Sequence, residues 1–186
     1  MADTGLINPT TQTAQINGAN AIDDDDDTFA SHISIGGTAI TMTFGSFNGT
    51  DPSAGSTING IEVFIRAAEN TFWQNVAYVV EIALDGVSGT YSSTTDTIDI
   101  DGTTTNYTLG SSTDLWGLDW SGWTDLSDLA VKIVADNYGG STGGHASSLN
   151  EVRAKVYYTE GVTVVKNGKI SLTSGKLTLS SGKISL

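Results

Sequence analysis

The stretch Thr57-Ile-Asn-Gly-Ile-Glu-Val-Phe-Ile-Arg66 decides the fold class of this chain. Ile61, Val63 and Ile65 alternate with larger or charged neighbours, which is the period of two that is typical of a strand with one face on a core. Asn59-Gly60 can adopt positive φ and predicts a sharp turn into this strand. Residues 152–158 alternate in the same way. Two long strands with many short ones between them predict an antiparallel β-sandwich that is closed by its last strand.

Short apolar runs separated by turn residues predict the remaining strands. Residues 40–44 alternate, residues 76–84 predict a strand covered on both sides, and residues 129–135 predict another buried strand. Residues 87–113 predict one or two edge strands with Asp101-Gly102 as a hairpin turn. Residues 1–20 are interpreted as a lead-in arm or edge strand, and residues 136–150, with four glycines, as a long exposed loop. Helical periodicity longer than about two turns is absent, which indicates an all-β protein.

The charge of the chain is divided unevenly along its length. Residues 1–160 hold all 21 acidic side chains and four basic ones, a formal charge of −17, whereas residues 161–186 hold four lysines and no acid, so the whole chain carries −13. An acidic body repels nucleic acid and anionic membranes, and we expect neither as a partner. Because there is no Cys, no secretory signal and no apolar run of roughly 20 residues, we expect a soluble protein without disulfides.

Residues 161–186 contain a repeat of seven residues, in which Gly-Lys is followed by alternating apolar and Ser or Thr residues. The apolar spacing of two and then five excludes a coiled coil, which needs three and four. A lone hairpin of this size is unstable in water, so the segment must pair with its own body, with copies of itself or with a neighbouring molecule. The predicted contact residues of this β-repeat arm are Lys169, Ile170, Leu172, Lys176, Leu177, Leu179, Lys183, Ile184 and Leu186.

Five consecutive aspartates at positions 23–27 are the best candidate for ion chemistry. Calcium takes six to eight oxygen ligands, and alternate carboxylates with backbone carbonyls in a tight loop can supply them. Neutralising the cluster would also order the loop. The alternative is a solvated acidic loop that holds no fixed ion.

Aromatic residues in loops allow two interpretations. Trp116, Trp120 and Trp123 could form a platform on which a sugar stacks, but such residues more often fill a core or anchor an interface because each buries a large area. For possible contact with a ligand we select three aromatic residues in the predicted loops 66–75 and 136–150, namely Phe72, Trp73 and Tyr138.

The sequence contains no pattern that indicates catalysis. His32 and His145 are the only histidines and lie far apart in the sequence. A Gly-x-Ser-x-Gly elbow and a phosphate-binding loop are both absent. We therefore predict no catalytic residue and a protein that is not an enzyme.

Three blocks of the sequence together resemble a β-sandwich that recurs among structural proteins of tailed bacteriophages and prophages. The blocks are residues 20–30, residues 58–63, and residues 114–117 followed by Trp120, Thr124 and residues 152–159. The resemblance covers about residues 17–160. It implies a virion component such as a capsid decoration protein, a head fibre or a tail-associated subunit.

A second likeness is to galactose-binding-like jelly rolls of the discoidin and carbohydrate-binding-module type. It is carried by Ala21-Ile22-Asp23 to Thr28 and by Glu151-Val152-Arg153, although Asp24 stands where those proteins have glycine. In that family an early loop and a Glu that opens the last strand hold a structural calcium. The resemblance therefore implies a jelly roll with a Ca²⁺ ligand set of Asp23, Asp25, Asp27, Thr28 and Glu151.

Together these observations predict one fold and two candidate functions. We expect an all-β, antiparallel jelly-roll β-sandwich over residues 1–160 and a β-repeat arm over residues 161–186. The first candidate is a non-enzymatic capsid decoration or cement subunit on the virion surface, assembled in the host cytoplasm and released by lysis. Its partners would be copies of itself, as a homotrimer, and other virion proteins. The alternative is a carbohydrate-binding or adhesin module of a phage tail or head fibre, whose ligand is a glycan.

Overall fold

The computed structural model describes residues 1–13, 30–34, 39–69, 76–92, 96–100, 102–137 and 145–161. Within these ranges the chain forms strands and one short 3-10 helix, η2 (Leu126–Asp128), and no helix there is long and apolar enough to cross a membrane. One sheet consists of β1 (Ala2–Asp3), β3 (Ala30–Ser34), β5 (Thr57–Glu69), β8 (Thr105–Ser111) and β10 (His145–Thr159). The other consists of β2 (Pro9–Thr13), β4 (Ile40–Phe47), β6 (Val76–Ala83), β7 (Asp96–Ile100) and β9 (Ala130–Asn137).

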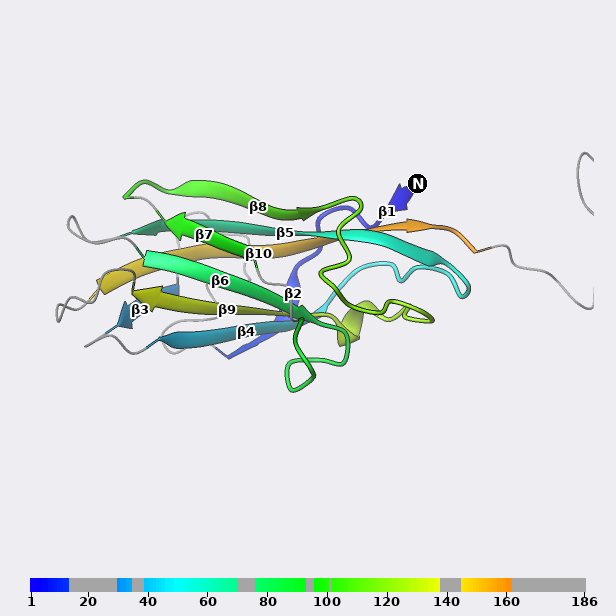
Figure 1. Ribbon diagram of the computed structural model, residues 1–186, viewed down its shortest axis with the longest axis horizontal. Helices are drawn as coiled ribbons and strands as arrows, with labels where there is room; N and C mark the ends of the chain where they lie inside the picture. Colours follow the sequence, from blue (N-terminus) through cyan, green and yellow to red (C-terminus); the bar gives the residue numbers. More distant parts are fainter. Residues whose placement is uncertain are drawn as a thin grey trace, which may run out of the picture.

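The two sheets pack face to face as a jelly roll (Figure 1). One sheet has the order β3-β10-β5-β8 and the other β4-β9-β6-β7, and the paired strands are antiparallel throughout. From β3 to β10 the chain changes sheet at every connection except β6 to β7, which is the order of two Greek keys. β1 pairs with β10 and β2 with β4, so the first residues form edge strands on both sheets. The predicted fold class is confirmed.

The core of the sandwich is built on the pairing of β5 with β10. Ile61, Val63 and Ile65 are fully buried, and across the sheet they face Val156, Ala154 and Val152. Their neighbours in β5 are only half-buried on the outer face. The strand predicted from residues 61–66 is therefore confirmed, and it extends from Thr57 to Glu69.

The predicted turn at Asn59-Gly60 is wrong, because β5 continues through both residues. Tyr157 pairs with Gly60 and Tyr158 with Ile58, so Asn59 is the extra residue of a β-bulge. Glycine is required at position 60 because the backbone at Ser111 passes close to its Cα atom, and not because φ is positive there. A Cβ atom added there would lie 2.4 Å from the carbonyl oxygen of Ser111.

The predicted loop 136–150 is wrong at both of its ends, which are strands, whereas residues 138–144 lie outside the described residues. A second β-bulge explains the error at residues 145–150. β9 extends to Asn137, β10 begins at His145, and the register of β10 on β5 shifts between Leu149 and Glu151. Before the shift the odd positions Ser147 and Leu149 face the core, and after it the even positions do. Because the alternation changes phase there, residues 145–150 do not show a continuous period of two.

The predicted hairpin at Asp101-Gly102 is also wrong. β7 pairs with β6 in one sheet, whereas β8 pairs with β5 in the other, so the chain between them crosses the sandwich. Both strands are edge strands, as the sequence predicted. A turn sequence between two short apolar runs indicates that the chain reverses direction there. It does not indicate whether the two strands pair with each other or with different strands.

β6 is an interior strand whose outer face is only partly covered. Tyr78, Val80 and Ile82 are fully buried in the core. On the opposite face Ala77 and Ala83 are fully buried, whereas Val79 and Glu81 are half-buried. The Tyr78 hydroxyl donates a hydrogen bond of 2.8 Å to Ser147 Oγ of the facing sheet, and burial raises its pKa. The apolar sequence predicted that both faces of β6 would be covered. The core face is fully covered, and the outer face only partly.

Gly110 is the position where we expect a single methyl group to be most damaging. Gly110 has φ +76, and an added Cβ atom would lie 2.3 Å from Ile61 O and 2.7 Å from Trp116 Nε1. Neither neighbour can withdraw, because one is backbone and the other is a buried indole. Gly110→Ala should reduce the free energy of unfolding by about 3 kcal/mol, measured by denaturant titration.

Gly122→Ala is the matched control for this substitution. Gly122 has the same φ of +76, but nothing lies within 4 Å of its Cβ position. The free energy of unfolding of Gly122→Ala should fall only by the cost of placing alanine in the left-handed conformation, about 1 kcal/mol. Equal losses in the two variants would show that the contacts with Ile61 O and the Trp116 indole do not matter.

Candidate functional site

The connection between β8 and β9 contains three of the four tryptophans and forms one end of the sandwich (Figure 1). It is held together by three similar turns, in which an aspartate accepts a hydrogen bond from the backbone N–H two residues later. Asp114 Oδ1 accepts from Trp116 N (2.8 Å), Asp119 Oδ1 from Ser121 N (2.9 Å) and Asp125 Oδ1 from Ser127 N (2.9 Å). These turns were not predicted from the sequence, although the repeated Asp-x-Trp/Ser spacing is typical of them.

The turns direct the tryptophans inward. Trp116 is 1% exposed and its Nε1 donates to Ile61 O (3.3 Å), while Trp120 is 5% exposed and its Nε1 donates to Leu115 O (2.9 Å). Trp123 packs edge-to-face on Trp120 with ring centroids 5.0 Å apart. An open stacking platform made of the three rings is therefore not formed, and the interpretation that these residues fill the core is confirmed.

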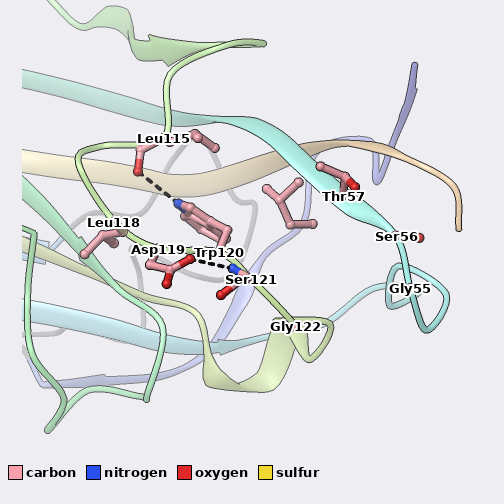
Figure 2. Close-up of a pocket in the computed structure, with 10 residues that line it drawn as sticks. Gly55, Ser56, Thr57, Leu115, Leu118, Asp119, Trp120, Ser121 and Gly122 are labelled. Carbon is pink, nitrogen blue, oxygen red and sulfur yellow. Dashed lines mark hydrogen bonds between the residues drawn. The ribbon is translucent and has the colours of Figure 1, made fainter.

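A pocket of about 490 Å³ opens beside this loop. The start of β5 forms one wall, and the tryptophan loop forms the other. Figure 2 shows the Trp120 indole between Leu118 and Thr57, with Asp119 and Ser121 below it in the view. The lining residues are Gly55, Ser56, Thr57, Ile58, Leu115, Leu118, Asp119, Trp120, Ser121 and Gly122.

Local hydrogen bonds fix both walls. On the β5 side, Ser56 N donates to Ser53 O (2.9 Å), and Ser56 Oγ accepts from the N–H of Gly161 (3.2 Å), where the chain leaves β10. On the other side, the backbone N–H and the hydroxyl of Ser121 hydrogen-bond to Asp119 and lower the pKa of its carboxyl group. The pocket is therefore preformed, and its carboxylate is ionised at neutral pH.

The chemistry of the lining is simple. Ile58, Leu115 and Leu118 are its aliphatic residues, and hydroxyl groups, one carboxylate and exposed backbone contribute polar atoms. Among the lining residues there is no cation, and Asp119 is the single ionisable group. Such a site can bind a neutral molecule with one apolar face and several hydroxyl groups.

Most of the site residues predicted from sequence lie outside the described residues. These are the calcium ligands Asp23, Asp25, Asp27 and Thr28, the aromatic residues Phe72, Trp73 and Tyr138, and the whole set of contact residues between Lys169 and Leu186. Their roles stay predictions. The strand β5 does show that the predicted loop 66–75 begins too early, because the strand continues to Glu69.

Glu151 is the one predicted calcium ligand that the structure describes. It lies in β10 opposite Arg66, is 6% exposed, and its Oε1 is 2.5 Å from Arg153 Nε. A cation at this oxygen would have to compete with the guanidinium group. Within the described ranges, no group of three or more His, Asp or Glu side chains could hold a metal ion.

The two histidines are distant in sequence but lie on neighbouring strands. β3 pairs with β10 so that position 32 is opposite Ser147 and position 145 is opposite Ser34. Sequence analysis could not detect this proximity, because it depends on the pairing of two segments more than a hundred residues apart.

Comparison with known proteins found only remote similarities among solved structures. No family model and no curated protein matches the sequence. Among solved structures, TmCBM61 in complex with β-1,4-galactotriose is similar with a TM-score of 0.37 and 6% identity over 77% of this chain and 79% of that one. An exo-β-agarase is similar with a TM-score of 0.45 and 12% identity over 87% of this chain.

A truncated AlyQ, with CBM32 and alginate lyase domains, is similar with a TM-score of 0.42 and 17% identity over 87% of this chain. The match spans 24% of the agarase chain and 34% of the AlyQ chain. At these TM-scores and identities the likeness assigns neither fold nor ligand, and the β-sandwich is established by the strand pairing of the chain itself.

Calcium binding can be tested through stability. If the acidic loop and Glu151 form the predicted site, excess Ca²⁺ should raise the melting temperature above the value measured with chelator, because the ion binds only the folded state. Glu151→Gln should reduce this shift. Identical melting curves with Ca²⁺ and with chelator would rule out a structural calcium.

Proposed function

We propose that this protein is a non-catalytic carbohydrate-binding module whose ligand occupies the pocket beside the tryptophan loop. The observation that carries the proposal is the composition of that pocket: an apolar, indole-containing interior with hydroxyl groups and one oriented carboxylate. The proposal depends on the pocket itself.

The pocket matches the two-sided character of a pyranose ring. One face of such a ring carries C–H groups, which pack on aliphatic and aromatic side chains, whereas its edge carries hydroxyl groups that need hydrogen-bond partners. Leu115 and Leu118, with the 5% of Trp120 that is exposed, offer the first kind of surface, and Asp119 with Ser121 offers the second. A volume of about 490 Å³ is within the usual range for small-molecule pockets.

The charge of the chain favours a neutral sugar. Residues 112–129 contain four aspartates and no Lys, Arg or His, and the chain as a whole carries −13. A uronic acid or a sulfated sugar would bring a second negative charge to Asp119 with no cation in the lining to balance it. We therefore infer that the ligand is a neutral glycan.

The same lining supports binding without hydrolysis. Glycoside hydrolysis uses two carboxyl groups on opposite sides of the scissile bond. Asp119 is the single carboxylate among the residues that line the pocket, and its hydrogen bonds with Ser121 lower its pKa, which is the opposite of what a general acid needs. We expect no turnover of a bound glycan.

Asp119→Asn tests the proposal directly. Asn retains the oxygen that accepts from Ser121 N, so the turn is kept, but the charged acceptor is lost. Affinity for a neutral oligosaccharide, identified on a glycan array and measured by calorimetry, should fall at least about tenfold, because hydrogen bonds to a charged group contribute more than neutral ones.

Asp125→Asn is the matched control. Asp125 is exposed, accepts from Ser127 N at the same 2.9 Å, and lies outside the pocket lining. This variant should bind like the original protein. Equal losses in both variants, or no saturable binding of any neutral glycan, would contradict the proposed function.

The pH dependence of binding follows from the pKa of Asp119. This pKa lies below the ordinary value of 3.8, so the carboxylate is ionised at every higher pH. Affinity should therefore be constant between about pH 5 and pH 8 and should be lost only as the pH falls through the lowered pKa. A midpoint near neutral pH would show that another group controls binding.

The capsid decoration function stays a separate prediction. It depends on the contact residues of the β-repeat arm, which lie outside the described residues. Assembly through the arm and binding of a glycan at the pocket would involve different parts of the chain, so a head or tail fibre could combine the two.

A further inference from the structure

β8 is the last strand of its sheet, and its outer edge carries no paired strand among the described residues (Figure 1). We propose that this edge pairs with the β8 edge of a second copy of the chain, joining the two sheets across a two-fold axis. Strand pairing at an edge gives an association in which backbone hydrogen bonds provide affinity and side chains select the register. This inference is independent of the proposed function.

Among the edge strands in the described ranges, β8 is the longest that carries neither charge nor proline; β3 also lacks both but has only five residues. Natural edge strands avoid pairing through charge, proline or short length. β7 carries Asp96 and Asp99, β2 begins with Pro9, and β1 is only two residues long. β8 has seven residues, Thr-Asn-Tyr-Thr-Leu-Gly-Ser, with no charge and no proline.

The sequence of β8 is complementary to itself in one antiparallel register. With Thr108 on the two-fold axis, Tyr107 of one copy is opposite Leu109 of the other, and Asn106 is opposite Gly110. Leu109 is 4% exposed and Tyr107 packs against the core, so each new pair would extend the apolar interior across the axis. Aromatic–aliphatic and Thr–Thr pairs are favourable cross-strand neighbours.

Charge also favours this edge over the rest of the surface. Within each copy, β5 places Arg66 opposite Asn106 and Glu62 opposite Gly110. In this register Asn106 is opposite Gly110 of the second copy, so Arg66 and the second copy's Glu62 lie in one row across the joined sheets. The row occurs twice by symmetry, but the two charges are three strand spacings apart, about 14 Å, so salt largely screens their attraction. Each chain carries a net charge of −13, so two copies repel each other. Electrostatic repulsion is smallest when they approach through an edge strand without charged residues.

The length of the edge limits the strength of the association. Seven residues span about 24 Å, which gives a contact smaller than the roughly 800 Å² per partner of a standard interface. We therefore expect a weak dimer that depends on concentration. Salt should strengthen it, because screening reduces the repulsion between the two acidic bodies.

Cysteine cross-linking tests the proposal in the 186-residue chain, which has no Cys of its own. Thr108 is exposed, and T108C places the new thiols of two copies opposite each other on the axis. Under mild oxidation T108C should form disulfide-linked dimers at least tenfold faster than T97C, whose exposed thiol lies on the charged edge strand β7. Equal rates would reflect random collision and would overturn the proposal.

A second variant gives a test that does not depend on disulfide geometry. T108K places two like charges opposite each other on the axis, which disfavours pairing. In sedimentation experiments its association constant should be at least tenfold lower than that of the original protein, whereas T97K should leave it unchanged. If T108K associates as strongly as the original protein, another surface holds the copies together and the β8 edge is excluded.

Discussion

The register between β5 and β10 is the constraint on which the rest of the structure depends. These are the two longest strands, and they pair from Thr57–Thr159 to Glu69–Ser147 at the centre of one sheet. A slip of one residue would turn Val63 and Ala154 toward solvent and their charged neighbours toward the core. The two β-bulges, at Asn59 and Asn150, each add one residue to a strand. The strands therefore continue, while core-facing residues change between odd and even positions.

The end of the sandwich is organised by this same pair of strands. Gly60 lies under the chain at Ser111, Ile61 N donates to Asp114 O, and Ile61 O accepts from the Trp116 indole. The tryptophan loop is therefore attached to the first residues of the central strand. Aspartate turns then shape the loop without regular secondary structure, which is how a loop can be both irregular and preformed.

The proposed function and the proposed dimer use separate features of one scaffold. The pocket lies where the chain enters β5, and the dimer edge is the neighbouring strand β8. Pairing two copies through β8 would place two pockets in one assembly, and two linked weak sites bind a polymer more tightly than one site does. Weak recognition of a single sugar unit would then be compatible with firm attachment to a glycan chain.

The sequence by itself determined the fold class, the alternating faces of β4, β5 and β10, the burial of β9 and the acidic character of the body. These follow from local periodicity and composition, which need no knowledge of partners. Only the tertiary structure decided that β7 and β8 belong to different sheets, that Asn59 and Asn150 are bulges, and that Gly55–Ile58 and Leu115–Gly122 enclose a pocket. These features depend on contacts between segments some 50 to 100 residues apart, and a turn residue or a tryptophan has the same local pattern whichever partner it finally meets.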